Sequence, residues 1–362
     1  MLRLRRTLCQ TVPGFISCAL VRPARRVAHI SLFAACRLNC IGTALQLELC
    51  GHGCLPVENH YLGTQKMPEF PFDWVDAFTD RPFGGNGCAV VHGGAQLPEE
   101  VACAYVRETS LVECTFTGPS DIADVKVRYF LASREIPFAG HPTIATVAAM
   151  RDRGLISGQQ ITLETAAGIV PVELDGDQIV MQQVAPHFGP CPDLELVAAA
   201  IDLPEAAILG QPQLVSTGLP FCITVLRDQD SLRAARLNAA AMAPLGEALG
   251  ADGQDVMEPF LVTLEGFTRV GDTFSRLLML PPSPPEDPFT GSATGAMAAY
   301  LWRHGLMTKP SFIAEQGHLM GRPGQAHVSL VGRPDAPDGI RVGGKGFVLM
   351  RGSVDLPEAL LD

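Results

Sequence analysis

Short apolar stretches separated by turn residues dominate the chain after residue 66. Alternation and β-branched or aromatic content predict strands at 70–78, 88–91, 111–116, 125–131, 221–226 and 276–280. Longer segments predict helices at 98–110, 194–201 and 234–249. This mixture of strands and helices indicates an α+β fold.

One nine-residue pattern occurs twice, at residues 135–143 and 286–294. Glu, Pro, Phe, Gly and Thr recur at the same offsets, and each copy leads into an Ala-rich apolar segment. The two copies are 151 residues apart, much farther than the repeats of a solenoid. The pattern therefore predicts two similar halves.

Each copy of the pattern reads as a loop that enters a helix. Pro142 suits the first helical position after His141, and Ser292 suits an N-cap. The first N–H groups of a helix lack intrahelical partners and the helix dipole is positive there, so each start can bind an anion. Two such starts facing one cleft would hold a small acid from both sides.

The same patterns divide the chain into parts. The Pro-rich passage 186–192 predicts a hinge, and the segments 340–344 and 346–351 are predicted to form a closing hairpin. We expect a first half, a second half and a C-terminal strand that returns to the first half, at residues 67–186, 187–346 and 347–362.

Glu113 is the charged residue in an otherwise uncharged predicted strand. Two interpretations fit equally well. It can be a solvated side chain on an edge strand. Alternatively, it is a carboxyl group in a dry cleft, where desolvation raises its pKa into the range useful for acid/base catalysis.

Residues 1–66 differ from the rest of the chain. They carry eight Arg or Lys against two Glu, with no acidic residue before Glu48. An Arg-rich, acid-poor start is typical of a mitochondrial transit peptide; the alternative is that translation starts at Met67. No apolar run reaches the ~18 residues of a membrane span. We expect this extension to lie outside the fold.

Charge in the remaining chain limits the possible partners. Residues 67–362 carry 19 basic against 36 acidic side chains, a net charge of −17. A nucleic-acid-binding protein needs a basic face, so this class is excluded. The segment 84–87 predicts a turn, and Gly346 stands where a nucleotide-binding P-loop needs Ser or Thr, so no cofactor is predicted.

Cysteine usage indicates a reducing compartment, and we expect the cytoplasm. Six of the eleven cysteines precede Met67 and the others are scattered singly, without the paired spacing of a disulfide framework. Cys50, His52 and Cys54 lack a second ligand pair at finger-like spacing, so no metal site is predicted.

The two repeated helix starts and the isolated Glu113 point to proton movement on carbon. This chemistry needs a positioned base that can return the proton, and donors that stabilise the developing negative charge. The helix starts can supply the donors.

Several stretches resemble the phenazine biosynthesis PhzF-like proteins. They occur in family order at residues 75–86, 113–116, 128–130, 136–143, 216–221, 286–295, 315–317, 321–323 and 342–344. The resemblance implies the diaminopimelate epimerase fold, with two pseudo-symmetric halves, each a mostly antiparallel sheet wrapped round a central helix. The cleft between the halves would hold the site.

The resemblance also implies an activity and its residues. It places the catalytic carboxylate at Glu113 and the substrate-binding positions at Gly140, His141, Asp287, Gly291 and Ser292. Well-studied members are homodimers that isomerise trans-2,3-dihydro-3-hydroxyanthranilate without a cofactor. We therefore expect a homodimeric isomerase that moves a proton between carbons of a small carboxylated, cyclic substrate.

Departures from the family pattern keep two alternatives open. Val112, Cys114 and Phe289 differ from the usual family residues, so the chain can be a catalytically silent member that binds a small acid or a protein. A thiol-dependent epimerase would use Cys114. Relatives that racemise amino acids carry Cys at the positions of His141 and Ser292, so two-thiol chemistry is not predicted.

Overall fold

A computed structural model of the chain describes residues 38–41, 44–47, 68–251, 257–281 and 283–360. It divides into two compact units, Met1–Gln65 and Lys66–Asp362. In the first unit, β1 (Leu38–Ile41) and β2 (Ala44–Leu47) pair antiparallel. The predictions of a transit peptide or later start, and the Cys50 to Cys54 pattern, lie outside the described residues.

The second unit begins with strands that surround one helix. Its first half contains β3 (Glu69–Ala77), β4 (Asn86–Val91), η1 (Gly94–Gln96), α1 (Glu99–Thr109), β5 (Cys114–Gly118), β6 (Val125–Phe130), β7 (Glu135–Ile136), α2 (Gly140–Asp152), β8 (Gln160–Thr165), β9 (Gly168–Asp175) and β10 (Gln178–Gln183). The strands and helix predicted in this half are confirmed, apart from the start of β5.

The second half has a similar succession of elements. It contains β11 (His187–Phe188), α3 (Leu194–Ala200), η2 (Glu205–Ala207), β12 (Gln213–Ser216), β13 (Pro220–Val225), α4 (Gln229–Ala234), α5 (Ala239–Leu249), β14 (Pro259–Thr263), β15 (Thr273–Leu278), β16 (Glu286–Asp287), α6 (Gly291–Arg303), β17 (Ser311–Gln316), η3 (His318–Met320), β18 (Gly324–Arg333) and β19 (Ala336–Gly344). After it come β20 (Gly346–Asp355) and η4 (Glu358–Leu360). The helix predicted at 234–249 begins only at Ala239, where Asn238 caps α5, because α4 already ends at Ala234.

Strand pairing is mostly antiparallel, which confirms the predicted α+β class. Parallel pairs occur where a helix connects two strands, as in β6 with β8 across α2 and β15 with β17 across α6. The pairing of β3 through β10 follows the same order as the pairing of β12 through β19.

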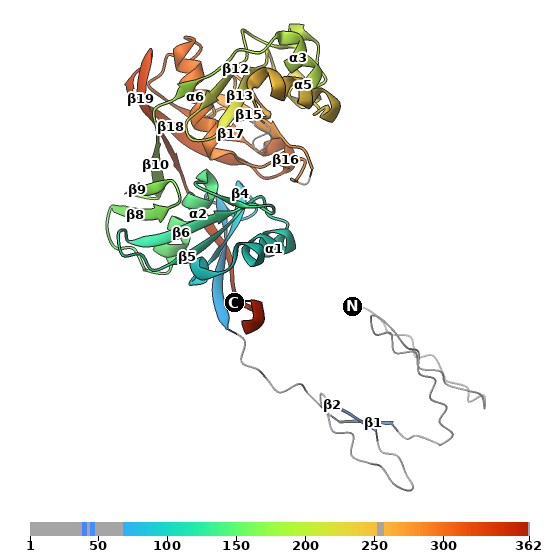
Figure 1. Cartoon of the computed structure of the whole chain (residues 1–362), viewed down its shortest axis with the longest axis vertical. Helices are drawn as coiled ribbons and strands as arrows, with labels where there is room; N and C mark the ends of the chain where they lie inside the picture. The colour runs from blue at the N-terminus through green and yellow to red at the C-terminus, as the bar shows by residue number, and fades with distance from the viewer. Residues whose placement is uncertain (1–37, 42–43, 48–67, 252–256, 282, 361–362) are drawn as a thin grey trace, which may run out of the picture. The chain divides into compact units, whose positions relative to one another are not determined.

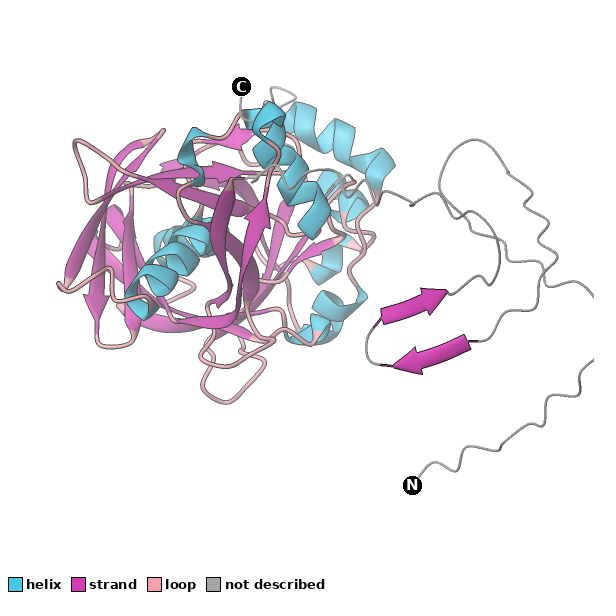
Figure 2. Ribbon diagram, turned by 90° about the horizontal axis from the view of Figure 1, so that it is seen from below, coloured by secondary structure: helices cyan, strands magenta, loops and turns pink. Residues whose placement is uncertain are grey.

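Helices α2 and α6 are each 13 residues long and mostly buried. Their Ala, Gly and Thr residues are small enough for strands to approach the helix closely from several sides. Figure 2 shows strands curving around a helix in this way. Apolar residues of both helices belong to one hydrophobic core. The helices of the two repeated segments therefore lie at the centre of this core.

The two halves are joined by strand pairing as well as by the chain (Figure 1). β10 of the first half pairs with β19, and β20 pairs with β3 along its length. The predicted closing hairpin is therefore wrong. β19 already pairs with β10 and β18, so the chain turns at Lys345 and pairs with the first half instead.

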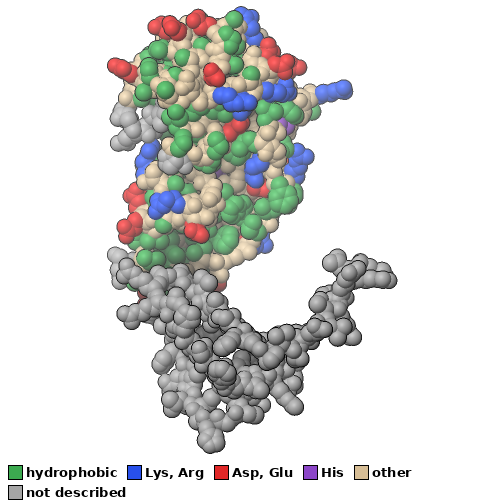
Figure 3. Space-filling view, turned by 90° about the vertical axis from the view of Figure 1, so that its right-hand side faces the viewer, with side chains coloured by type: hydrophobic (Ala, Val, Ile, Leu, Met, Phe, Trp, Pro, Cys, Tyr) green, Lys and Arg blue, Asp and Glu red, His purple; other side chains and the backbone are tan. Residues whose placement is uncertain are grey.

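Charged side chains are spread over the surface. On the face drawn in Figure 3, Lys and Arg side chains of the described residues are interspersed with Asp, Glu and apolar side chains. Among the described helices, none is both long and apolar enough to cross a membrane.

Candidate active site

Both central helices begin earlier than their capping patterns predicted. The N-cap of α2 is Ala139 and that of α6 is Thr290, so Pro142 is the third helical residue and Ser292 the second. Proline fits at the third position because the N–H it lacks would have no intrahelical acceptor there. Neither N-cap side chain accepts a hydrogen bond from its own helix. The N–H groups of each first turn are therefore not capped by these side chains.

The two helix starts meet end to end. A Cβ on Gly140 would lie 3.1 Å from the backbone nitrogen of Ser292 and 3.3 Å from the Cα of Gly291. Because this spacing is tighter than ordinary van der Waals contact, glycine is the residue that lets the two backbones approach. The unpaired N–H groups of both first turns therefore converge on one place.

Glu113 lies beside this junction, in the connection between α1 and β5. Helix α1 ends at Ser110 in a left-handed conformation with φ of 54°, and pairing with β4 starts only at Cys114. The prediction that 111–113 is strand is therefore wrong. The Glu113 side chain is 14% exposed and its Oε2 lies 3.4 Å from Nδ1 of His141, which rules out the solvated-edge interpretation.

The surroundings decide the protonation states of this pair. Burial, and then the charge of Asp287, raise the pKa of Glu113 to about 8. Burial, and then the charge of Arg322, lower the pKa of His141 to about 3. At neutral pH the imidazole is therefore uncharged, so the 3.4 Å contact with Glu113 is not an ion pair.

Asn86 connects the sequence-predicted residues across the two halves. Its Nδ2 lies 2.7 Å from Oδ1 of Asp287, 2.9 Å from the carbonyl of Phe289 and 3.2 Å from Nδ1 of His141. The amide has two protons, and the two nearer oxygens take them. Nδ1 of His141 therefore lies between this amide and Glu113, and its Nε2 is buried without a partner.

Asp287 is a second buried carboxyl group. Burial raises its pKa to about 6, although hydrogen bonds from Thr290 and Asn86 act to lower it. The Thr290 hydroxyl donates to Oδ2 of Asp287 at 2.5 Å. Gln316 holds this loop, because its Nε2 donates to the Asp287 carbonyl at 2.8 Å and its Oε1 accepts from the Thr290 amide at 3.1 Å.

The start of α6 is also held from the first half. Gln183 donates from Nε2 to the Gly291 carbonyl at 2.9 Å, and its Oε1 accepts from Thr217 at 2.6 Å. Thr217 also reaches the Ser292 carbonyl at 3.3 Å. These contacts fix where the second helix start points.

Sequence reasoning had assigned no role to Asn86, Gln183, Thr217 or Gln316. Asn86, Thr217 and Gln316 lie in stretches that resemble the family, at 75–86, 216–221 and 315–317. Their place in these stretches is the sequence feature that could have identified them. Gln183 lies outside those stretches, and its contacts with α6 are visible only in the fold.

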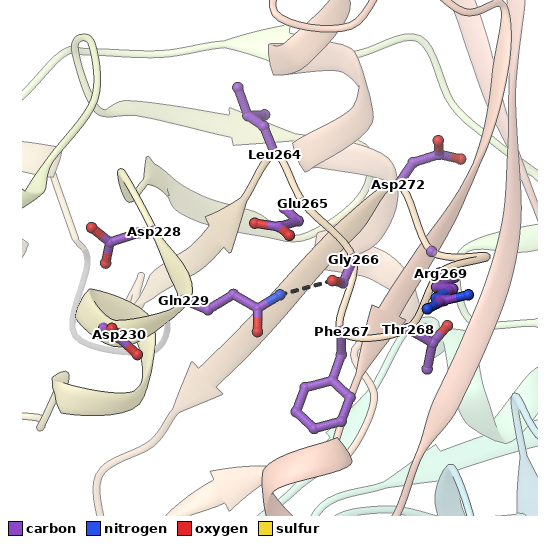
Figure 4. Close-up of a pocket in the computed structure, with 11 residues that line it drawn as sticks. Asp228, Gln229, Asp230, Leu264, Glu265, Gly266, Phe267, Thr268, Arg269 and Asp272 are labelled. Carbon is purple, nitrogen blue, oxygen red and sulfur yellow. Dashed lines mark hydrogen bonds between the residues drawn. The ribbon is translucent and has the colours of Figure 1, made fainter.

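Two cavities of the structure differ in their distance along the chain from the proposed site residues. One of about 570 Å³ borders Leu111 and Val112, the residues before Glu113, and Ser283 and Pro284 border it from the second half. A separate cavity of about 730 Å³ lies between the Asp228 loop and residues 264–272 (Figure 4). None of the sequence-predicted site residues lines this second cavity.

The arrangement is typical of proton transfer to and from carbon. Glu113 can hold or release a proton near neutral pH, and neutral His141 touches it. The helix starts offer N–H groups to a carboxylate or to developing negative charge.

Comparison with known families gives this arrangement a context. The family model for phenazine biosynthesis-like proteins, PhzC-PhzF, matches residues 75–352. The chain belongs to this family. The resemblance noted from its sequence is therefore confirmed.

The similarity to individual relatives covers nearly the whole length of those proteins. An uncharacterized isomerase of Salmonella typhimurium, YddE, is 31% identical over 291 residues, 76% of this chain and 95% of that protein. The trans-2,3-dihydro-3-hydroxyanthranilate isomerase of Pseudomonas fluorescens is 29% identical over 296 residues, 78% of this chain and 98% of that protein. These names and the family confirm the predicted enzyme class, isomerase.

A solved structure of the family supports the fold. The phenazine biosynthesis protein of Bacillus anthracis, of the PhzF family, aligns with a TM-score of 0.71 and 25% identity. The alignment covers 80% of this chain and 100% of that chain.

Proposed function

We propose that this chain is a cofactor-independent isomerase that moves a proton between carbons of a small carboxylated, cyclic substrate. Glu113 would act as the acid/base, and the substrate would resemble the one named for the Pseudomonas fluorescens relative. The contact of 3.4 Å between buried Glu113 and His141, at the junction of the two helix starts, carries this proposal.

In the proposed reaction, the carboxylate form of Glu113 removes a proton from a substrate carbon. The electron pair left on carbon delocalises into the conjugated system and toward the substrate carboxylate, which the N–H groups at Gly140 and Gly291 stabilise. Glu113 then returns the same proton to a second carbon, so the composition of the substrate is unchanged. His141 would keep the carboxyl group in place through the contact of its Nδ1 with Glu113.

The bare Nε2 of His141 suggests a feature of the substrate. It is buried without a partner, so a hydroxyl group of the substrate, which can donate or accept, would satisfy it. His141, Asp287 and Ser292 would then define the polar side of the site. We also propose that the two halves arose by duplication and that the enzyme acts as a homodimer in the cytoplasm.

A thiol mechanism has weaker physical support. The Cys114 side chain is fully buried, and burial raises the pKa of its thiol to about 12. A thiol with this pKa is protonated at neutral pH and is a poor base.

Deuterium exchange tests the proposed role of Glu113. Small cyclic carboxylic acids with a donor group are incubated with the enzyme in D₂O, and uptake at carbon is followed by NMR. The Glu113→Gln variant keeps the size of the side chain but removes the base, so exchange should fall by about 10²-fold or more. Cys114→Ala is the matched control and should exchange like the wild type.

Two outcomes would contradict this mechanism. Unchanged exchange in Glu113→Gln would exclude the carboxylate as the base. A substrate that binds the wild type without any exchange would instead indicate a member that only binds a small acid.

A further inference from the structure

A third cavity, different from the two described above, lies between the two halves, and we call it the arginine cavity. Its volume is about 680 Å³. It is lined from the first half by Phe78, Thr79, Asp80, Arg81 and Gln178, from the second half by Thr268, Arg269, Val270, His318, Pro323, Gln325 and His327, and by Lys345. No residue assigned to the proposed active site lines it.

The arginine cavity concentrates positive charge on an acidic protein. Three cationic side chains and one carboxylate line it, whereas residues 67–362 carry a net charge of −17. Arg81 and Arg269 are exposed at its rim, and within the described part of the chain their guanidinium groups have no hydrogen-bond or ion-pair partner. Lys345 lies 3.6 Å from Asp80 and 3.9 Å from Asp177, distances of weak ion pairs.

Unpaired buried atoms give a second, independent indication. In the described residues, four buried side-chain polar atoms lack a hydrogen-bond partner, and two of them belong to residues that line this cavity: Gln178 Oε1 and His318 Nδ1. A third is Nε2 of His141 in the candidate active site. Buried polar atoms without partners are rare, so Gln178 Oε1 offers an acceptor to a ligand in this cavity.

The wall of the cavity on the second half is held in place. The fully buried carboxylate of Glu315 accepts from the Thr268 amide at 2.8 Å, from the Thr268 hydroxyl at 2.6 Å and from Gln325 at 2.7 Å. The neighbouring Arg269 therefore extends from an anchored loop. Figure 4 shows Thr268 and Arg269 at the end of this loop that is remote from Asp228 and Asp230.

Phe78 lies between this cavity and the candidate active site. It lines the arginine cavity, and its ring stacks on Phe289 with centroids 4.3 Å apart. A Cβ on Gly291 would meet the same ring at 2.9 Å. The arginine cavity is thus a separate site whose wall touches the start of α6.

We propose that the arginine cavity binds a small, multiply charged anion that also carries a hydroxyl or amino donor. Arg81 and Arg269 pair with its charged groups, because a guanidinium binds phosphate or carboxylate through two parallel hydrogen bonds. The donor satisfies Gln178 Oε1. A ligand held by both arginines bridges the two halves.

Calorimetric titration of the full-length protein tests this site. The probes are pyrophosphate, citrate and tricarballylate, which is citrate without its hydroxyl, all at constant ionic strength. We expect pyrophosphate or citrate to bind the wild type, with the tighter of the two identifying phosphate or carboxylate ligands. Citrate should bind more tightly than tricarballylate, and Gln178→Leu should abolish that difference.

The double variant Arg81→Gln with Arg269→Gln should weaken binding by about tenfold or more. Arg227→Gln with Arg333→Gln removes the same charge from exposed positions outside the cavity and should bind like the wild type. Glu113→Gln should also bind like the wild type, since the two sites are separate. Equal losses in the two double variants, or no binding of either anion to the wild type, would overturn the proposal.

Discussion

Glu113 shows how one side chain links the proposed reaction to stability. Its pKa rises from 4.5 to about 8 because burial disfavours the charged form, and the Asp287 charge adds to this. The folded protein therefore holds a proton that the unfolded chain releases at lower pH. The resulting stabilisation is present below pH 4.5 and is lost as the pH rises through about 8.

Glu113→Gln should remove this pH dependence. At pH 9 the variant should be more stable than the wild type by on the order of 2 kcal/mol, an amount reduced by the side chain's partial contact with water. The difference should shrink toward pH 5, where both side chains are neutral in the folded state. Urea unfolding at pH 5, 7 and 9 measures it, and a difference that does not vary with pH would contradict the raised pKa.

At the scale of secondary-structure elements, the junction of α2 and α6 depends on glycine. Gly140→Ala adds a methyl group 3.1 Å from the backbone nitrogen of Ser292, so the helix starts must move apart. We expect a loss of about tenfold to a hundredfold in exchange activity and of about 1 kcal/mol in stability. Isomerase assays and thermal unfolding measure the two effects.

Gly246 in α5 is the matched control for this substitution. A Cβ there would lie 3.5 Å from the Cβ of Ala251, which is ordinary contact. Gly246→Ala should leave activity unchanged and stabilise the helix by about 0.5–1 kcal/mol. If Gly140→Ala behaved in the same way, the close approach of the helix starts would have no functional role.

Asp73 joins three elements of the first half. This buried carboxylate accepts from Arg153 after α2 at 2.5 and 3.0 Å, contacts His92 at 2.8 Å and accepts from Arg351 of β20 at 3.2 Å. Burial acts to raise the pKa of Asp73, but the hydrogen bonds from Arg153 and His92 outweigh it, so its pKa is lowered.

Asp73→Asn should cost about 3 kcal/mol at pH 7, because it leaves these donors without their anion. A lowered carboxyl pKa stabilises the fold above the ordinary value of 3.8, and this contribution is lost as the pH falls through the folded pKa. The variant should therefore lose less stability than the wild type below pH 4. Asp335→Asn, in an exposed pair with Arg333, should change stability by under about 0.5 kcal/mol.

At the scale of the whole molecule, the halves meet through packing as well as strand pairing. Phe78 of the first half stacks on Phe289 of the second, and both rings are fully buried. Arg322 crosses the same boundary, donating to Asp76 at 2.7 Å and to the carbonyls of Gly84 and Gly85 at 2.9 Å.

Phe289→Ala should open a cavity at this boundary. We expect a stability loss of about 3–5 kcal/mol and, at temperatures where the variant is folded, a loss of activity as the helix starts shift. Phe312→Ala makes the same truncation beside Trp302, inside the second half, and should lower stability without lowering activity. Equal activities of the two variants would show that the boundary does not position the site.

The sequence by itself predicted much of this protein. The duplicated pattern located α2 and α6, the uncharged surroundings of Glu113 singled it out, and the family stretches named His141, Asp287 and Ser292. These features are local or repeated, so spacing and residue type are enough to find them.

Only the tertiary structure decided how these residues lie relative to one another. Asn86 reaches Asp287 across 201 positions of the chain, and Gly140 meets Gly291 because one continuous sheet places the two central helices end to end. The pKa values of Glu113, His141 and Asp287 depend on desolvation by distant segments. Such effects arise from neighbours that only folding brings together, so no local pattern contains them.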